Sequence, residues 1–173
     1  MKEVLTIGFV ATAISPYFSE EQQVRIKSEN HLKKIIAEYD AKLICFHKTI
    51  FSKEDSVEAE KFFKNKIDFL ILQTSSCSSG EQLYPLCNIT NKMGLWAVPD
   101  LEKEGDVKLH SLVSVSHYLG IIKKILHEKK IKTKWFYNYG DTDEFKNKFL
   151  ITLRSLVADK KIKQSKIGLV GGI

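Results

Sequence analysis

Short apolar runs alternate with longer segments of helical period along this chain, and that alternation limits the folds it can adopt. The short runs are rich in β-branched residues, whereas the longer segments repeat apolar residues at helical spacing. Strands buried on both faces need continuous apolar runs, and helices that cover a sheet need one apolar stripe. The sequence therefore predicts a three-layer α/β domain, Rossmann-like or flavodoxin-like, in which helices flank a mainly parallel sheet. The predicted strands are residues 4–10, 42–46, 69–73, 95–98, 133–137 and 167–170.

Helical segments are predicted between these strands. Ser19 and Ser52 each precede such a segment and can cap it through the side-chain hydroxyl. Pro85 is expected in the first turn of the third helix, where a proline is tolerated. The predicted helices begin near 19, at 52, at 82 (ending at 91), at about 111 (ending at 128) and after 141 or 143. The fourth is expected to turn a set of apolar side chains inward, namely Leu112, Val115, Leu119, Ile122, Ile125 and Leu126.

The chain is long enough for one sizeable core, because 43% of its 173 residues are hydrophobic. Residues 1–163 are predicted to form one domain that ends in a long helix. Residues 164–173 have the pattern of a strand followed by a glycine turn at Gly171 and Gly172, which normally opens a unit. We therefore expect this chain to be the front part of a larger α/β protein.

The net charge of +6 comes largely from lysines concentrated late in the chain. Such lysines could attract phosphates or an acidic partner, but they are also typical of a solvated surface. No aromatic-rich basic motif favours nucleic acid, and no apolar stretch approaches the ~20 residues of a membrane span. The amino terminus does not fit a signal peptide, and the three cysteines lack a CxxC spacing. These features predict reduced thiols and a cytoplasmic protein without a nucleic-acid or membrane partner.

In a sheet of this kind ligands bind outside the carboxyl ends of the strands, so the loops there form the candidate site. The first loop carries neither a glycine-rich dinucleotide motif nor a P-loop lysine. The third contains a serine cluster before Gly80, which could offer hydroxyls and amides to a polar ligand or could form an ordinary turn and helix cap. The five loops are 11–18, 47–51, 74–81, 99–110 and 138–143.

Residue types that commonly carry catalysis form no recognisable constellation in the sequence. His110 stands where a loop becomes a helix and could direct its imidazole toward the strand ends, although the lack of an orienting partner favours a structural role. Cys77 has no base near it in sequence. The sequence therefore predicts no catalytic residue and no metal ligand in this chain. The other helical histidines, which lack a partner at metal-ligand spacing, are His31, His117 and His127.

Six segments carry a family resemblance through their order along the chain. They are 70–74 (LILQT), 95–100 (LWAVPD), 109–115 (LHSLVSV), 134–137 (KWFY), 149–156 (FLITLRSL) and 166–172 (KIGLVGG). In this order, over nearly its whole length, the chain resembles the amino-terminal region of the L-fucose and L-arabinose isomerase superfamily.

The resemblance implies a cytoplasmic, oligomeric enzyme that interconverts an aldose and a ketose through an enediol. A divalent metal, usually Mn²⁺, would assist the reaction, and the metal ligands and acid/base carboxylates would belong to later domains. This chain would bind no cofactor itself. It would supply a peripheral Rossmann-like domain that helps to close the sugar site of a neighbouring subunit, and it would be inactive alone.

The chain departs from the fucose-type pattern, so the sugar preference of that subgroup does not transfer. Fucose isomerases look to have an arginine in the first loop and an aromatic residue after the third strand, whereas this chain has other residues at 11–16 and 75–78. Two alternatives to the isomerase reading stay open: a non-catalytic sugar-binding or regulatory domain, and an oligomerisation module. The candidate sugar contacts, chosen because they sit at strand ends and can hydrogen-bond hydroxyls, are Tyr17, Gln73, Ser76 and His110.

Overall fold

One parallel sheet of five strands forms the centre of the computed structural model, which describes residues 4–14, 20–100, 109–166, 168 and 171. The strands lie in the order β2-β1-β3-β4-β5, and every neighbouring pair is parallel. The predicted α/β class and the mainly parallel sheet are thereby confirmed. The strands are β1 (Leu5–Thr12), β2 (Ala41–Ile50), β3 (Phe69–Thr74), β4 (Lys92–Ala97) and β5 (Lys132–Tyr137).

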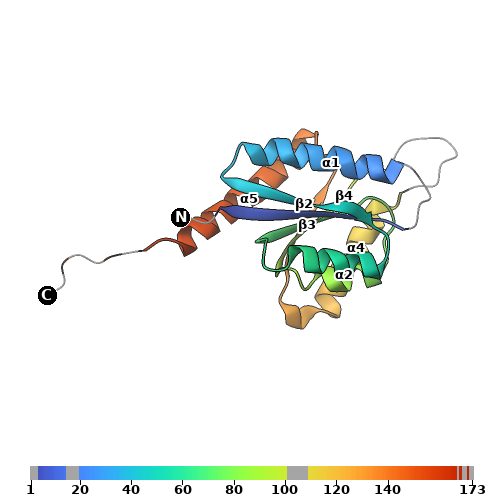
Figure 1. Cartoon of the computed structure of the whole chain (residues 1–173). Helices are drawn as coiled ribbons and strands as arrows, with labels where there is room; N and C mark the ends of the chain where they lie inside the picture. The colour runs from blue at the N-terminus through green and yellow to red at the C-terminus, as the bar shows by residue number, and fades with distance from the viewer. Residues whose placement is uncertain (1–3, 15–19, 101–108, 167, 169–170, 172–173) are drawn as a thin grey trace.

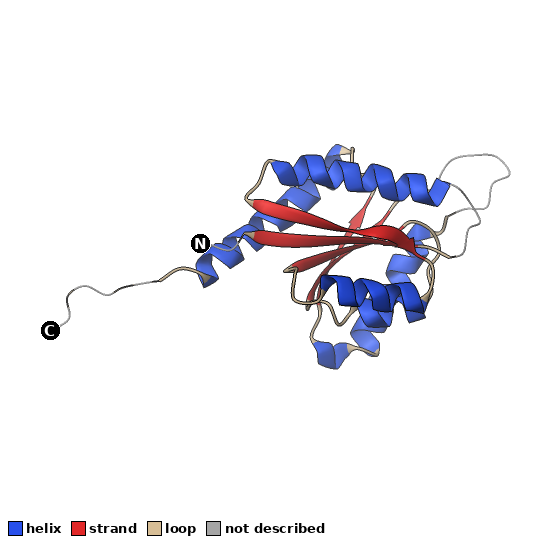
Figure 2. Ribbon diagram, in the orientation of Figure 1, coloured by secondary structure: helices blue, strands red, loops and turns tan. Residues whose placement is uncertain are grey.

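Helices cover both faces of this sheet (Figure 1), and Figure 2 shows the strands between the two helical layers. One layer contains α1 (Glu20–Ala37) and α5 (Asp143–Lys163); the other contains α2 (Lys53–Phe63), α3 (Gly80–Leu86) and α4 (Ser111–Lys124). Each layer closes its own apolar core. Trp96 and Phe145 stack within the core under α1 and α5, with ring centroids 4.3 Å apart. Among the described helices, none combines the length and the apolar character needed to cross a membrane.

Several element boundaries differ from the sequence-based expectations. β2 continues to Ile50, so 47–51 belongs mostly to a strand rather than to a loop. α3 begins at Gly80, two residues before the predicted start, and ends at Leu86, which moves Pro85 from the first turn to the last. α4 ends at Lys124 and a short 3-10 helix follows it at His127–Lys129. The predicted strand 167–170 lies, except for Gly168, outside the described residues.

The inward face predicted for α4 was partly wrong. Val115 and Ile122 are buried as expected, but Leu112 and Ile125 are exposed. The buried face instead includes Tyr118 and two serines of the first turn, Ser111 and Ser114. An apolar repeat cannot reveal this, because the amino end of α4 packs on polar backbone at the strand ends rather than on the apolar core.

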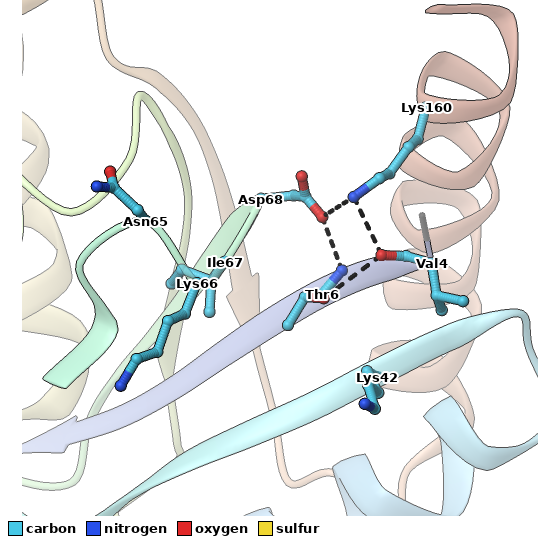
Figure 3. A pocket seen from close by; sticks show the side chains of 8 residues that line it. All are labelled: Val4, Thr6, Lys42, Asn65, Lys66, Ile67, Asp68 and Lys160. Atoms are coloured by element: carbon cyan, nitrogen blue, oxygen red, sulfur yellow. Dashed lines mark hydrogen bonds and ion pairs between the residues drawn. The ribbon is translucent and has the colours of Figure 1, made fainter. Parts of the chain in front are cut away.

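At the amino ends of the strands, Asp68, which precedes β3, connects β1 and α5 beside a surface cavity of about 470 Å³ (Figure 3). Its Oδ2 accepts hydrogen bonds from the Thr6 N–H and from Lys160 Nζ, each at 2.7 Å, and Lys160 also donates to the Val4 carbonyl at 3.0 Å. Lys160 lies in the last turn of α5, where a cation offsets the negative end of the helix dipole. The contacts explain this region as a structural junction that fixes α5 to the start of the sheet.

Candidate binding site at the carboxyl ends of β1, β3 and β4

The strand order places a topological switch point between β1 and β3, where connections leave the sheet toward opposite faces. At this point the segment after β3 crosses the end of β1. The Ser75 N–H donates to the Thr12 carbonyl at 2.8 Å, and the Ile14 N–H donates to Ser76 Oγ at 3.3 Å. The two strand ends are therefore joined by hydrogen bonds rather than separated by an open cleft.

Buried hydroxyls continue this connection below the surface. Ser78 Oγ donates to Thr12 Oγ1 at 3.0 Å, and the Ser78 N–H donates to Ser114 Oγ of α4 at 2.8 Å. All three side chains are buried. Because buried hydroxyls are costly unless they are paired, these bonds fix the backbone of the serine segment in one conformation.

Gln82 of α3 links the same segment to β1. Its Nε2 donates to the Ala13 carbonyl at 2.8 Å, while its Oε1 accepts from the Ser79 N–H at 3.0 Å and from the Tyr118 hydroxyl at 3.4 Å. Burial raises the pKa of Tyr118 to about 12, so this phenol stays protonated and acts as a donor. Residues 75–82 thus form a rigid polar floor at the switch point.

Ser111 makes the corresponding junction between β3, β4 and α4. Its Oγ accepts the Val98 N–H at 2.9 Å, donates to the Thr74 carbonyl and lies 3.0 Å from Thr74 Oγ1. The amino end of α4 is therefore held against the ends of both strands. This arrangement positions the residues that immediately precede α4.

Among the predicted sugar contacts that lie in the described residues, His110 is the one with an exposed side chain. It adopts the left-handed conformation with φ 55° and ψ 30° at the N-cap of α4. Its N–H donates to Asp100 Oδ1 at 2.9 Å. A non-glycine residue in this conformation is under strain that its surroundings must offset, and such residues are common at functional sites.

Ser76 and Gln73 have polar atoms that the protein itself already engages. Ser76 is buried, with 5% of its surface exposed, and its Oγ accepts from the Ile14 N–H and donates to the Cys77 carbonyl at 3.3 Å. Gln73 is fully buried: its Nε2 donates to Ser28 Oγ of α1 at 2.6 Å, and its Oε1 accepts from Ser75 Oγ at 3.2 Å. A sugar contact by Gln73 stays a prediction and would require these bonds to break. Tyr17 lies outside the described residues.

Chemically, the site consists of hydroxyls, amides and backbone groups that mostly bond one another, with His110 exposed. Such groups suit hydrogen bonding to an uncharged polar ligand better than proton transfer, because the buried ones do not ionise near neutral pH. In the part of the chain that the structure describes, no three His, Cys, Asp or Glu side chains gather to hold a metal ion. The placement of the metal ligands in later domains stays a prediction.

Sequence reasoning missed most of the residues that build this site. Thr12, Gln82 and Ser114 were not among the candidates, although Thr12 lies just after a predicted strand and all three hydrogen-bond at the strand ends. One usable sign was the serine pair Ser111 and Ser114, which lie three residues apart and therefore on one face of a helix.

The sequence matches no protein-family model, and no curated protein matches it significantly. The function proposed below therefore rests on the resemblance in the sequence and on the geometry at the strand ends.

Proposed function

We propose that this chain is the amino-terminal α/β domain of a sugar isomerase-like protein, and that it helps to bind a monosaccharide without carrying the isomerisation chemistry. In the complete cytoplasmic enzyme an aldose and a ketose would interconvert through an enediol, in a homo-oligomer. Mn²⁺ or another divalent metal, held by later domains, would polarise the sugar oxygens. The second domain would begin at about residue 164, after the long helix α5.

One observation supports this proposal most directly: the switch point carries a rigid floor of uncharged polar groups. His110 is exposed there, whereas Ser76 and the other polar groups are buried and fixed by hydrogen bonds. A sugar is recognised by hydroxyl-bonding groups held in place before binding, because less conformational freedom is then lost. The resemblance supplies the substrate class, and the geometry is compatible with it.

The first test is the mass of the native protein in its source cells, together with the reading frame after Ile173. We expect the frame to continue for several hundred residues and to supply clustered Glu, Asp and His ligands. The complete protein should then convert L-arabinose or L-fucose to the ketose in the presence of Mn²⁺. A frame that ends at Ile173, or a complete protein inactive on aldoses with every divalent metal, would refute the isomerase proposal.

A non-catalytic sugar-binding or regulatory domain is the second candidate, and the same polar floor favours it. In that case a free sugar should bind this chain equally well with and without EDTA. The two candidates differ in the complete protein: the isomerase proposal expects metal-dependent conversion of an aldose to a ketose, whereas a binding or regulatory domain expects sugar binding without conversion.

An assembly module is the third candidate, and exposed apolar side chains on α5 favour it. Ile151 is 64% exposed and Ile162 is 72% exposed. The two lie eleven residues apart on α5, about three turns, and therefore on one side of the helix, where exposed apolar side chains can form an association surface. Sedimentation that changes with protein concentration, and loses that dependence in Ile151→Glu and Ile162→Glu, would support this candidate.

A further inference from the structure

β2 carries an irregularity at its carboxyl half. Phe9 of β1 pairs with Cys45, but Ala11, two residues later, pairs with Thr49, four residues later. Residues 46–48 of β2 therefore bulge opposite Val10 alone. Bulges of this kind re-aim side chains, and they are common beside active sites.

Beside the bulge lies a cavity of about 320 Å³. Its walls come from three elements: α1 supplies Arg25 and Ile26, the bulged strand supplies His47, Lys48 and Thr49, and the start of α2 supplies Asp55. Phe51 follows the strand, and it and Ile26 are the apolar residues of the lining. The volume is within the range of small-molecule sites, and a mixture of apolar wall and a few polar groups is typical of them.

Thr49 has a further property that the fold alone does not explain. Its Oγ1 is buried and, among the buried side-chain polar atoms of the described residues, it is the one without a hydrogen-bond partner. An unpaired buried hydroxyl costs about 1–3 kcal/mol, so such atoms are rare in folded proteins. The hydroxyl belongs to a residue that lines the cavity, where a ligand oxygen could become its missing partner.

The charges around the cavity are already balanced. Arg25 Nη1 lies 2.9 Å from Glu29 Oε2, and Lys48 Nζ lies 2.6 Å from Asp55 Oδ1 and 2.8 Å from Glu58 Oε2. An ionic ligand would compete with these pairs and leave a charge unpaired, which is unfavourable. A neutral ligand can use the remaining donors and acceptors without breaking them.

Donors are available for such a ligand. Arg25 uses Nη1 for Glu29 and for the Phe46 carbonyl at 3.4 Å, whereas its other guanidinium N–H groups have no partner within the described part of the chain. Its side chain is only 14% exposed, so the guanidinium is held in place before binding. The Asp55 carboxylate accepts the Phe51 and Ser52 N–H groups through Oδ2 and pairs with Lys48 through Oδ1, so a ligand hydroxyl can donate only to a remaining lone pair of it while accepting from Arg25.

We propose that this cavity binds a neutral polyhydroxylated small molecule of monosaccharide size, at a site separate from the switch point between β1 and β3. The apolar side chains of Ile26 and Phe51 would cover the C–H face of the ligand, while Arg25, Thr49 and Asp55 bond its hydroxyls. The inference goes beyond the proposed function, because it stands on the chemistry of this cavity and requires no isomerase activity.

The test uses the 173-residue chain, labelled with ¹⁵N and titrated separately with L-arabinose, L-fucose and inorganic phosphate to about 50 mM, since a monosaccharide site of this kind is expected to be millimolar. We expect either sugar to shift the amide signals of 47–51 and 25–26. Phosphate should leave them unchanged, because the charges of the cavity are internally paired.

Two variants and one matched control examine the named contacts. Arg25→Gln should weaken sugar binding about tenfold and Thr49→Val about fivefold, as expected for the loss of one good hydrogen bond each. Thr49→Val should melt at the same temperature as the parent or higher, since it removes a hydroxyl that has no partner. Lys33→Gln also removes a partner of Glu29 but lies outside the cavity lining, so it should change the affinity less than twofold.

Several results would overturn the inference. Sugar-induced shifts confined to 76–78 and 110–112 would move the ligand to the switch point and leave the proposed function intact. Phosphate shifts at 47–51 without sugar shifts would show an anion site instead. No sugar-induced shift at any amide would remove this site, and the isomerisation assay on the complete protein would still decide the proposed function separately.

Discussion

Lys160 Nζ and Asp68 Oδ2 lie 2.7 Å apart, and this ion pair fixes the last turns of α5 to the edge of the sheet where β1 and β3 begin (Figure 3). The two side chains are 17% and 35% exposed. The same carboxylate oxygen accepts the Thr6 N–H. One side chain therefore joins residues that are 62 and 92 positions away from it in sequence.

We expect Asp68→Ala to lower the free energy of unfolding by about 1–2 kcal/mol, because it removes a charge-assisted bond and leaves the Thr6 N–H without its acceptor. The measurement is equilibrium unfolding in urea. Asp40→Ala is the matched control. Asp40 Oδ2 lies 3.4 Å from Lys161 Nζ, which belongs to α5 like Lys160, and both side chains are about 60% exposed. The control should cost less than about 0.5 kcal/mol. Equal effects of the two variants would contradict the role given to Asp68.

Replacing Gly94 or Gly120 by alanine should change the stability of the protein in opposite directions. A Cβ at Gly94 of β4 would lie 2.8 Å from Phe136 Cε2 and 2.9 Å from Phe69 Cζ, so Gly94→Ala should destabilise the protein by about 1–3 kcal/mol. At Gly120 of α4 a Cβ would meet no atom within 4 Å, and alanine is the better helix former. Gly120→Ala should therefore stabilise by about 0.5–1 kcal/mol. Thermal melting of both variants checks the pair, and a neutral Gly94→Ala would mean that the rings move without cost.

The period of the apolar residues was sufficient to predict the fold class. Runs such as 69–73 are buried at every position, which only a strand covered on both faces allows. The ends of the elements were less predictable. β2 continues past residue 46 through a bulge, and a bulge depends on the neighbouring strand rather than on local sequence.

The sequence predicts where the loops of the candidate site meet, but not how their polar groups pair. The parallel sheet determines that loops at the carboxyl ends meet, and Ser76 and His110 do lie in that region. Which polar groups pair with each other depends on where the helices lie. The Gln73 side chain donates to Ser28 of α1, and Ser111 is buried at the start of α4, where Leu112 was expected to be the buried residue. No spacing in the sequence encodes those contacts.

Ser111 provides a test of the buried polar junction. Ser111→Ala should cost about 2 kcal/mol, because the Val98 N–H would lose its acceptor in a buried position. Ser155→Ala on α5 is the control, since that hydroxyl is exposed and bonds only the Ile151 carbonyl of its own helix. The control should be neutral or slightly stabilising in urea unfolding. If Ser111→Ala is as harmless as Ser155→Ala, the junction contributes little to stability.

The three thiols are expected to differ in reactivity. Burial raises the pKa of Cys45 and of Cys87 to about 12, so at pH 8 only about one molecule in ten thousand carries either thiolate. Cys77 lies half-buried in the segment after β3. With Ellman's reagent at pH 8 we expect one fast thiol, and Cys77→Ser should abolish the fast phase. A fast phase that survives in Cys77→Ser would show that Cys45 or Cys87 becomes accessible by local opening.

Stability should fall in acid partly through Asp159. Hydrogen bonds from Lys92 and Lys163, at 2.7 and 2.9 Å, lower the pKa of this carboxyl from its ordinary value of 3.8 to about 2. A carboxyl whose pKa is lower in the folded state stabilises the fold above its unfolded pKa, and this contribution is lost as the pH falls from 3.8 toward 2. Asp159→Asn should therefore show a shallower loss of stability over that window.

The comparison needs a carboxylate that makes little contact. Asp143 is 96% exposed and lies 3.9 Å from Lys146, so Asp143→Asn should follow the parent protein. The measurement is the urea midpoint of all three proteins at several values between about pH 6 and pH 2, with the salt concentration held constant. Parallel curves for Asp159→Asn and the parent would mean that the hydrogen bonds from Lys92 and Lys163 stabilise the ionised Asp159 no more than water does in the unfolded chain. A curve that flattens only in Asp159→Asn would identify the contact between the start of β4 and the end of α5 as acid-sensitive, because the ion pair between Lys92 and Asp159 joins the first residue of β4 to the last turns of α5.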